Sequence, residues 1–457
     1  MAIVWLAIGQ CFAAAPKPHI LFILADDLGY ADVGFHGSEI KTPHLDRLAA
    51  SGARLEQFYV QPVCSPTRAA LLTGRYPMRH GLQVGVVRPC AQYGLPLGER
   101  TLPQALKEVG YTTAIVGKWH LGHFDPAYLP TGRGFDHQYG HYNGAIDYFT
   151  HMRDGGFDWH RDDGVCRDEG YATHLLAREA VRLIDEHDAA KPLFLYLAFN
   201  AVHAPLQVPD KYQEACRHLP RERRIYAGML AAMDEAIGEV VLALEKKAMK
   251  QNTLIVFCSD NGGPQPGKVT INGLLRAAKG TLYEGGVRVP ALATWDGQIK
   301  PGSVVKAPLP IVDWCPTLLK LAGVSTEQKR PIDGRDIWPV VTEGKSLPHP
   351  EILLNTTPRH GVIRVGDWKL VLNGQVLSTD GSEGNISETG STAPSRRIEL
   401  FNLEVDPNEQ NNLAAAMPEK VKELEARYNA LAKEAVPPKA HSKPQAFVSP
   451  PVWGEWD

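Results

Sequence analysis

Between residues 64 and 77 the chain reads CSPTRAALLTGRYP, with a proline two residues after a cysteine and an arginine four residues after it. A cysteine that only fills space does not need Pro66 or Arg68 at these positions, whereas a reactive cysteine can use a nearby cation. The apolar run that follows predicts a helix, and a helix N-terminus favours anions. Cys64 is therefore a candidate nucleophile, and its function depends on what the rest of the chain brings to it.

Oxygen ligands follow two apolar runs that predict buried strands. Asp26 and Asp27 end HILFILA, and Asp260 and Asn261 end TLIVFCS. Each pair alone is also a turn signal. Ligands of open α/β sheets bind beyond the carboxyl ends of the strands, however, so the two pairs together favour a metal site. Carboxylate and amide oxygens suit Ca²⁺ or Mg²⁺ and not zinc.

Cations and imidazoles recur near the same predicted edge. Lys118 and His120 are two residues apart in VGKWHLG, and such residues point to one side of an extended segment. His203 follows the apolar run KPLFLYLAF, and Lys279 precedes a glycine-rich turn. Singly, each is more often a solvated lysine or a satisfied histidine. With Arg68 they would form a pocket for a tetrahedral oxyanion, and histidine transfers protons near neutral pH.

These residues predict an oxyanion-ester hydrolase with one hard divalent cation, and they leave sulfate and phosphate open. With 48 Lys and Arg against 51 Asp and Glu, the net charge of −3 argues against a dedicated nucleic-acid binder. Five of the seven cysteines lie outside both the N-terminal apolar run and the motif, and this odd number implies no disulfide scaffold. Cys258, inside an apolar run, is predicted to be a buried free thiol.

Residues 1–15 are apolar and end in three alanines, as in a signal peptide, although no Lys or Arg lies near Met1. The run is too short to span a bilayer. A first strand that is not cleaved, or a misassigned start, is the alternative. We predict an exported protein without a membrane span.

Alternating apolar runs and amphipathic segments predict an α/β sandwich over residues 16–345, with helices flanking a large, mostly parallel sheet. Near Lys345 the pattern changes. GVIRVGDWKLVLNG alternates like antiparallel strands, and PEKVKELEARYNALAKEA predicts one amphipathic helix. Residues 346–457 are therefore predicted to form a smaller α+β domain that includes a polar loop, STDGSEGNISETGSTAPS, and an extended proline-rich tail.

The motif CSPTRAALLTGR resembles the signature of the type I sulfatase family, Cys-x-Pro-x-Arg followed by Thr-Gly. In the family's order the chain also carries ADDLGYADVGFHG, VGKWHLG, AVHAPLQVP, SDNGG and KGTLYEGGVRVP. The resemblance covers nearly the whole chain after the leader and implies an alkaline-phosphatase-like fold. Within the family, DVGFHGSEIKTPHLDRLAASG, KPLFLYLAFNAVHAPLQVP and the final VWGEWD are most similar to the arylsulfatase B (N-acetylgalactosamine-4-sulfatase) group.

The resemblance implies that a formylglycine-generating maturation enzyme reads Pro66 and Arg68 and oxidises Cys64 to Cα-formylglycine. The aldehyde, once hydrated, would attack sulfur and form a sulfate ester. A gem-diol can then expel sulfate intramolecularly, which a serine-type ester cannot do. One Ca²⁺ would be held by residue 64 and four further ligands. These four are Asp26, Asp27, Asp260 and Asn261.

The remaining site residues receive roles from the same resemblance. Lys118 and Lys279 would neutralise the sulfate oxygens together with the metal. His203, helped by Lys279, would protonate the departing sugar oxygen. His120 would accept a proton from the second hydroxyl, and Arg68 would hold the formylglycine hydroxyl in position.

Several alternatives stay open. A phosphoesterase of the same fold, such as a phosphonate monoester hydrolase, can carry the same motif, and a non-catalytic binder of sulfated glycans could keep the fold. Terminal GalNAc-4-sulfate of chondroitin or dermatan sulfate fragments is the leading substrate, and other sulfated sugars or aryl sulfates are its rivals. The basic run CRHLPRERRIY could contact an anionic glycan or be a solvated helix start. The shortness of the chain, its cysteine positions and its two sequons, at Asn355 and Asn385, favour a bacterial periplasmic or extracellular enzyme over a lysosomal one.

Overall fold

A computed structural model describes residues 17–357, 360–374, 397–439 and 443–455. The predicted signal peptide and the polar loop at 378–395 lie outside these residues. Within them an 11-stranded sheet has the order β11-β2-β12-β10-β1-β9-β3-β4-β7-β8, with β13 beside β2. Its strands are β1 (His19–Ala25), β2 (Ala53–Tyr59), β3 (Thr112–Lys118), β4 (His137–His141), β7 (His160–Arg161), β8 (Gly164–Val165), β9 (Leu193–Ala198), β10 (Thr253–Ser259), β11 (Arg288–Val289), β12 (Ala291–Thr294) and β13 (Ser303–Pro310).

The centre of this sheet is parallel and its flanks are mixed. β10, β1, β9, β3 and β4 run in one direction, so their carboxyl ends meet at one edge. β12 and β7 pair antiparallel on the two sides of this central group. The parallel centre with its helical layers confirms the predicted α/β class.

Each central strand is buried on both faces, which explains its continuous apolar sequence. In β1, Phe22 and Leu24 enter one core, and Leu21 and Ile23 enter the other. The first core is covered by α2 (Cys64–Thr73), α3 (Leu102–Lys107), α7 (Trp314–Leu321) and α8 (Trp338–Glu343). The second core is covered by α1 (Pro43–Ser51), α4 (Ala172–Glu186) and α5 (Arg221–Lys246).

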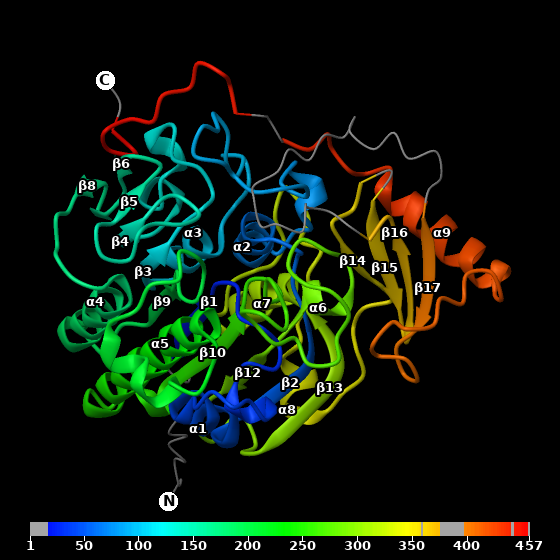
Figure 1. Cartoon of the computed structure of the whole chain (residues 1–457), viewed down its shortest axis with the longest axis horizontal. Helices are drawn as coiled ribbons and strands as arrows, with labels where there is room; N and C mark the ends of the chain where they lie inside the picture. Colours follow the sequence, from blue (N-terminus) through cyan, green and yellow to red (C-terminus); the bar gives the residue numbers. More distant parts are fainter. Residues whose placement is uncertain (1–16, 358–359, 375–396, 440–442, 456–457) are drawn as a thin grey trace, which may run out of the picture.

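A four-stranded antiparallel sheet follows, in the order β14-β15-β16-β17. Figure 1 shows it at the right of the molecule with α9 packed against it. The elements are β14 (Ile352–Leu354), β15 (Gly361–Val365), β16 (Trp368–Leu372), β17 (Ile398–Asn402) and α9 (Pro418–Ala432). The predicted boundary near Lys345 lies between α8 and β14, and the independence of the two parts stays a prediction.

The proline-rich tail crosses back to the opposite side of the molecule (Figure 1). It meets the hairpin of β5 (Met152–Arg153) and β6 (Gly156–Phe157). Trp453 is buried there, and its Nε1 donates to the carbonyl oxygen of Arg153 at 2.8 Å. In space, the end of the tail therefore packs on the large sheet's side and not on the C-terminal sheet.

A buried ion network joins the two sheets. Lys369 of β16 lies 2.8 Å from a carboxylate oxygen of Glu284 and 2.8 Å from one of Glu409. The Tyr59 hydroxyl donates to Glu284 at 2.7 Å. Because Glu284 begins α6 (Glu284–Val287), five residues after Lys279, the C-terminal sheet anchors the segment that carries a candidate site residue.

Two further sequence expectations are testable in the described residues. The six cysteines there are all free, and Cys258 is fully buried, as predicted. No helix in the described part of the chain combines the length and apolarity needed to cross a membrane.

Candidate active site

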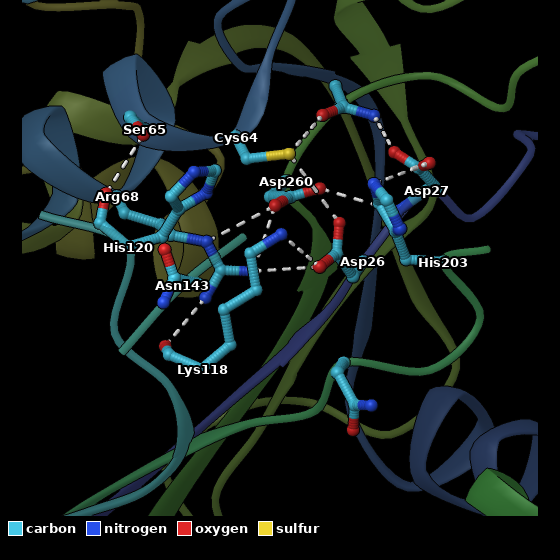
Figure 2. A network of polar contacts seen from close by, with 12 residues as sticks. Asp26, Asp27, Cys64, Ser65, Arg68, Lys118, His120, Asn143, His203 and Asp260 are labelled. Atoms are coloured by element: carbon cyan, nitrogen blue, oxygen red, sulfur yellow. Dashed lines mark hydrogen bonds and ion pairs between the residues drawn. The ribbon is translucent and has the colours of Figure 1, made fainter. Parts of the chain in front are cut away.

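The sequence-predicted site residues converge at the carboxyl edge of the parallel strands (Figure 2). Asp26 and Asp27 follow β1, Lys118 ends β3, and Asp260 with Asn261 follows β10. Loops after β9 and before α6 add His203 and Lys279, which both approach Asp27. The structure thus brings into one site the ten predicted residues, namely Asp26, Asp27, Cys64, Arg68, Lys118, His120, His203, Asp260, Asn261 and Lys279.

Cys64 is the first residue of α2, a helix whose ten residues are all buried. The turn before it is held by Thr67, whose hydroxyl accepts the backbone N–H of Gln61 at 2.9 Å. The Cys64 sulfur lies 3.6 Å from Asp26 Oδ1 and 3.5 Å from Asn261 Oδ1. Burial, reinforced by the Asp260 carboxylate, raises the pKa of the thiol far above its ordinary value. In the absence of a bound cation, these surroundings favour the protonated thiol over the thiolate.

Three carboxylates and three cations surround this sulfur. Arg68 donates to Asp260 Oδ2 through Nη2 at 2.9 Å and through Nε at 3.2 Å. Lys118 forms an ion pair with Asp26. Lys279 approaches Asp27 to 2.6 Å. The pocket combines fixed positive charge with acidic oxygens, as binding of an anion beside a metal ion requires.

The pKa values of Asp27 and Asp260 are shifted in opposite directions. Burial would raise the pKa of Asp27, but Lys279 and His203 hold it well below its ordinary value. Burial and the nearby Asp26 carboxylate raise the pKa of Asp260, and Arg68 offsets this only in part. A bound cation would favour the ionised form of Asp260, because positive charge beside a carboxylate lowers its pKa.

The donor atoms fit a hard divalent cation. Asp26, Asp27, Cys64 and His203 each offer one ligand atom within 4.8 Å of the others. Asn261 adds an amide oxygen that faces Cys64, and its Nδ2 donates to Asp27 Oδ1 at 2.7 Å. Buried carboxylate and amide oxygens of this kind match Ca²⁺ or Mg²⁺.

Two residues differ from the predicted set of metal ligands. Asp260 was predicted as a ligand but binds Arg68, and His203 was not predicted as a ligand but lies near the acidic group. The Asp260 carboxylate is occupied by Arg68, while His203 approaches the acidic group with its Nε2 3.6 Å from Asp27 Oδ2. Because oxygen ligands suit these ions better than imidazole, Asp26, Asp27, Asp260 and Asn261 stay the predicted ligands.

The backbone of His120 corrects one sequence argument. Lys118 and His120 were expected on one side of an extended segment, but β3 ends at Lys118 and His120 has φ 59°. This left-handed conformation is uncommon for a residue with a side chain, and it costs on the order of 1 kcal/mol. Figure 2 nevertheless shows the side chains of both residues at the site.

The His120 ring is held in one tautomer. Its Nε2 lies 3.0 Å from the carbonyl oxygen of Val87, and since a carbonyl only accepts, Nε2 carries the hydrogen. Nδ1 is buried without a partner among the described residues, which leaves it as a bare acceptor. Burial, with help from the Lys118 charge, lowers the pKa of His120 well below its ordinary value.

Residues that the sequence argument missed set this geometry. The Ser65 hydroxyl donates to the His120 carbonyl oxygen at 2.8 Å and accepts the Val87 N–H at 3.0 Å. Ser65 lies inside the motif, between Cys64 and Pro66, and this position was the one sequence feature that could have marked it as a site residue.

A strap of residues 141–144 supports the other side of the His120 ring. A Cβ added at Gly144 would lie 2.5 Å from His120 Cε1, so only glycine leaves room for the imidazole. Asp158, which is fully buried, accepts from the backbone N–H groups of Tyr142 and Asn143 at 2.9 Å each and from Asn143 Nδ2 at 2.8 Å. No local pattern in the sequence pointed to this support, because its parts are brought together only by the fold.

His203 is also fixed at one nitrogen. Its Nδ1 donates to the carbonyl oxygen of Ala204 at 2.6 Å, so Nε2 is the nitrogen that meets the site. Burial lowers the pKa of His203 to about 4, and Asp27 opposes the shift only in part. An anionic oxygen beside Nε2 would favour the protonated form.

The fold is of the alkaline-phosphatase-like class, and a site that combines carboxylates with cations lies at the carboxyl edge of its sheet. The sequence profile of the family described as Sulfatase matches residues 18–324. The chain belongs to the sulfatase family and is, with its curated relatives, a sulfuric ester hydrolase.

Two relatives illustrate the likeness. Arylsulfatase J of Mus musculus is 39% identical over 485 residues, an alignment that covers 97% of this chain and 81% of the relative. N-acetylgalactosamine-6-sulfatase of Mus musculus is 35% identical over 370 residues, covering 75% of this chain and 70% of the relative. The family is thereby shown, and a special proximity to arylsulfatase B is not.

Solved structures agree. Ps i-CgsB in complex with k-i-k-neocarrahexaose has a TM-score of 0.82 at 33% identity and covers 93% of this chain and 94% of its own. The phosphonate monoester hydrolase of Agrobacterium radiobacter has a TM-score of 0.63 at 21% identity, covering 90% and 96%. At that identity the second likeness concerns the fold alone.

Proposed function

We propose that the protein is a calcium-dependent, formylglycine-using sulfatase that removes sulfate from sulfated sugars, with terminal GalNAc-4-sulfate of chondroitin or dermatan sulfate fragments as its substrate. The observation that carries this proposal is the position of Cys64. Its buried sulfur lies 3.6 Å from Asp26 Oδ1 and 3.5 Å from Asn261 Oδ1, within the acidic cluster that could hold a metal ion. The group at position 64 is therefore placed to act beside a bound cation, and the Cys-x-Pro-x-Arg motif around it supports its conversion to formylglycine.

Some of the charged groups would bind the metal ion, and the others would bind the substrate. Calcium, held by Asp26, Asp27, Asp260 and Asn261, would supply positive charge to the sulfate oxygens. Hydrated formylglycine at position 64 would supply the nucleophilic hydroxyl and a second hydroxyl for sulfate release. Lys118 and Lys279 bind the remaining sulfate oxygens and neutralise their charge. Arg68, fixed by Asp260, orients the group at position 64.

The two histidines move protons on opposite sides of the site. His203 presents Nε2 and gives a proton to the departing sugar oxygen, with Lys279 near the same carboxylate. His120 accepts a proton at Nδ1, which is available because Nε2 is bound to Val87. The tautomer of His120 supports its role as the proton acceptor. His203 can donate only after Nε2 has gained a proton, because Nδ1 already donates to the Ala204 carbonyl oxygen, and an anionic substrate oxygen beside Nε2 favours that protonated form.

The relatives define the rival substrates. One is named for N-acetylgalactosamine-6-sulfate, and one solved structure holds a neocarrahexaose. A sulfate at another position, or a sulfated galactan, therefore replaces GalNAc-4-sulfate if the substrate proposal fails while the chemistry stands.

The test is sulfate release from defined saccharides that each carry one terminal sulfated sugar. The panel includes GalNAc-4-sulfate, GalNAc-6-sulfate and GlcNAc-6-sulfate, and phosphate and phosphonate esters accompany it. The protein is produced with a formylglycine-generating enzyme, and mass spectrometry measures conversion of Cys64. Cys64→Ala is the inactive variant, and Cys258→Ala is its matched control, since Cys258 is a buried free thiol in β10.

Release from GalNAc-4-sulfate by the converted protein and by Cys258→Ala, but not by Cys64→Ala, is the expected result. A chelator should abolish it, and added Ca²⁺ should restore it. Release from a different sugar would overturn the substrate alone. Turnover of phosphate or phosphonate esters without any sulfate release, at full conversion of Cys64, would overturn the proposal.

We also propose that the chain is exported to the periplasm or the extracellular space and that the maturation enzyme is its partner before folding. N-terminal sequencing of the protein secreted by an expression host tests this. A mature chain that begins near residue 16 is expected, and an intact Met1 in the folded product contradicts it.

A further inference from the structure

A hollow of about 500 Å³ lies at the start of α5, and its lining includes none of the residues assigned to catalysis. Its lining comes from three separate segments, and it combines apolar and charged side chains. The lining residues are Leu206, Pro220, Arg221, Glu222, Ile225 and Lys268. Arg221 belongs to the basic run CRHLPRERRIY, which the catalytic roles leave unused.

The walls of this hollow are tied to the active site. Leu206 follows His203 by three residues, and Lys268 lies in the loop between the predicted ligand Asn261 and Lys279. Two of the segments that line the hollow therefore also carry site residues.

Buried Asp32 fixes these walls to one another. The Arg223 Nη1 group, next to the hollow in α5, donates to Asp32 Oδ1 at 2.6 Å and to the carbonyl oxygen of Val269 at 3.0 Å. The Tyr226 hydroxyl donates to Asp32 Oδ2 at 2.9 Å and accepts the N–H of Gly29, two residues beyond Asp27. These contacts connect the start of α5, which forms one wall of the hollow, to the loop that follows the metal-binding end of β1.

The charge of the hollow is positive. Lys268 forms an ion pair with Glu222 at 3.0 Å, so the three charged lining residues Arg221, Glu222 and Lys268 sum to +1. Arg221 is exposed, and in the part of the chain that the structure covers no ion pair or hydrogen bond engages it. Leu206 and Ile225 add apolar surface of the kind that packs against a sugar ring. This combination suits a saccharide residue that carries one negative charge.

We propose that this hollow binds a second anionic group, a carboxylate or a sulfate, on the sugar next to the one that loses sulfate. The inference rests on the proposed function, because it takes a sulfated saccharide as the substrate. It assigns Arg221 and Lys268 to substrate affinity and not to the chemical step.

The test compares substrates that differ only in this second charge. One is an oligosaccharide in which a uronate neighbours the terminal sulfated sugar, and the other is its carboxyl-reduced analogue. A third carries a sulfate in place of the carboxylate. The test variant is the double substitution Arg221→Ala with Lys268→Ala. The control is Lys320→Ala, which changes an exposed lysine of α7 that pairs with Asp336.

The double variant should raise KM for the uronate substrate about five- to tenfold, as expected for two partly exposed ionic contacts. KM for the reduced analogue and kcat for both should stay at the wild-type values, and added salt should reduce the difference. A preference for the disulfated over the uronate substrate identifies the anion as sulfate. An equal change on charged and reduced substrates, or no change, overturns the inference.

Binding separates this inference from the proposed function. Calorimetry with Cys64→Ala measures the affinity of the uronate and reduced oligosaccharides without turnover. A charge-dependent loss of affinity in the double variant supports the hollow even if no substrate is hydrolysed. Hydrolysis of the substrate without a charge-dependent loss of affinity in the double variant supports the proposed function and contradicts the inferred binding site in the hollow.

Discussion

Removal of the buried ammonium of Lys369 should destabilise the junction between the two sheets severely. Lys369 and Glu284 are fully buried, Glu409 is 1% exposed, and the lysine lies 2.8 Å from each carboxylate. Lys369→Met keeps a similar shape but leaves two carboxylates without their cation. Breaking a buried ion pair from one side costs about 3–5 kcal/mol in the free energy of unfolding.

The loss should depend on pH. Burial raises the pKa of Glu409 from its ordinary 4.5 to about 7, although the Lys369 ammonium opposes the shift. Because the folded protein then binds the proton more tightly than the unfolded chain, this group's stabilisation is present at low pH and is lost as pH rises toward 7. Without Lys369 the opposing charge is gone, so the penalty continues to grow above pH 7. We therefore expect the loss of stability of Lys369→Met, relative to the wild type, to be largest in alkaline solution.

Thermal unfolding followed by near-UV circular dichroism measures the effect at about pH 5.5 and about pH 8.5. The expected fall in Tm at the higher pH is on the order of 5 °C or more. Lys420→Met is the matched control, since Lys420 forms a partly exposed pair with Glu423 and should contribute less than about 1 kcal/mol. A Tm of Lys369→Met equal to that of the control, or a larger loss at the acidic pH, would refute the reasoning.

Three further outcomes follow from the site. Gly144→Ala should push the His120 ring aside and lower kcat at least about tenfold, with KM nearly unchanged. Gly164→Ala is the control, because its added Cβ would make only ordinary van der Waals contact, and it should leave kcat and KM unchanged. Ser65→Ala removes the hydroxyl between His120 and Val87, so kcat should fall, and the free energy of unfolding should fall by about 1–3 kcal/mol because the buried Val87 N–H loses its acceptor; a normal kcat contradicts the role given to Ser65. Ca²⁺ at about 100 times its dissociation constant should stabilise the folded protein by about 2.7 kcal/mol, and an unchanged Tm with and without chelator argues against a metal site.

Much of the architecture followed from local patterns. HILFILA and TLIVFCS are continuous apolar runs because β1 and β10 are buried on both faces, and such runs are recognisable without a structure. The free thiol of Cys258 followed from the same fact. Thr101 caps α3 with a local signal of the same kind: its hydroxyl accepts the Gln104 N–H, and the Gln104 side chain accepts the Thr101 N–H in return.

Other features depended on distant contacts. The mixed edges of the large sheet depend on which strands meet, and alternation along one strand does not encode its neighbour. The return of Trp453 to β6 joins residues about 300 positions apart, and the proline-rich composition of the tail suggested only an extended surface segment.

The sequence by itself determined which groups meet at the site. Parallel strands bring their carboxyl ends to one edge, so Asp26, Asp27, Asp260 and Asn261 had to lie together once their strands were recognised. Only the tertiary structure decided how each group is presented. The positive φ of His120 and its single tautomer result from Val87, Ser65 and the strap at 141–144, which lie up to about 55 residues away. Composition and spacing specify where a side chain belongs, whereas the orientation of its lone pair depends on neighbours that only the folded chain supplies.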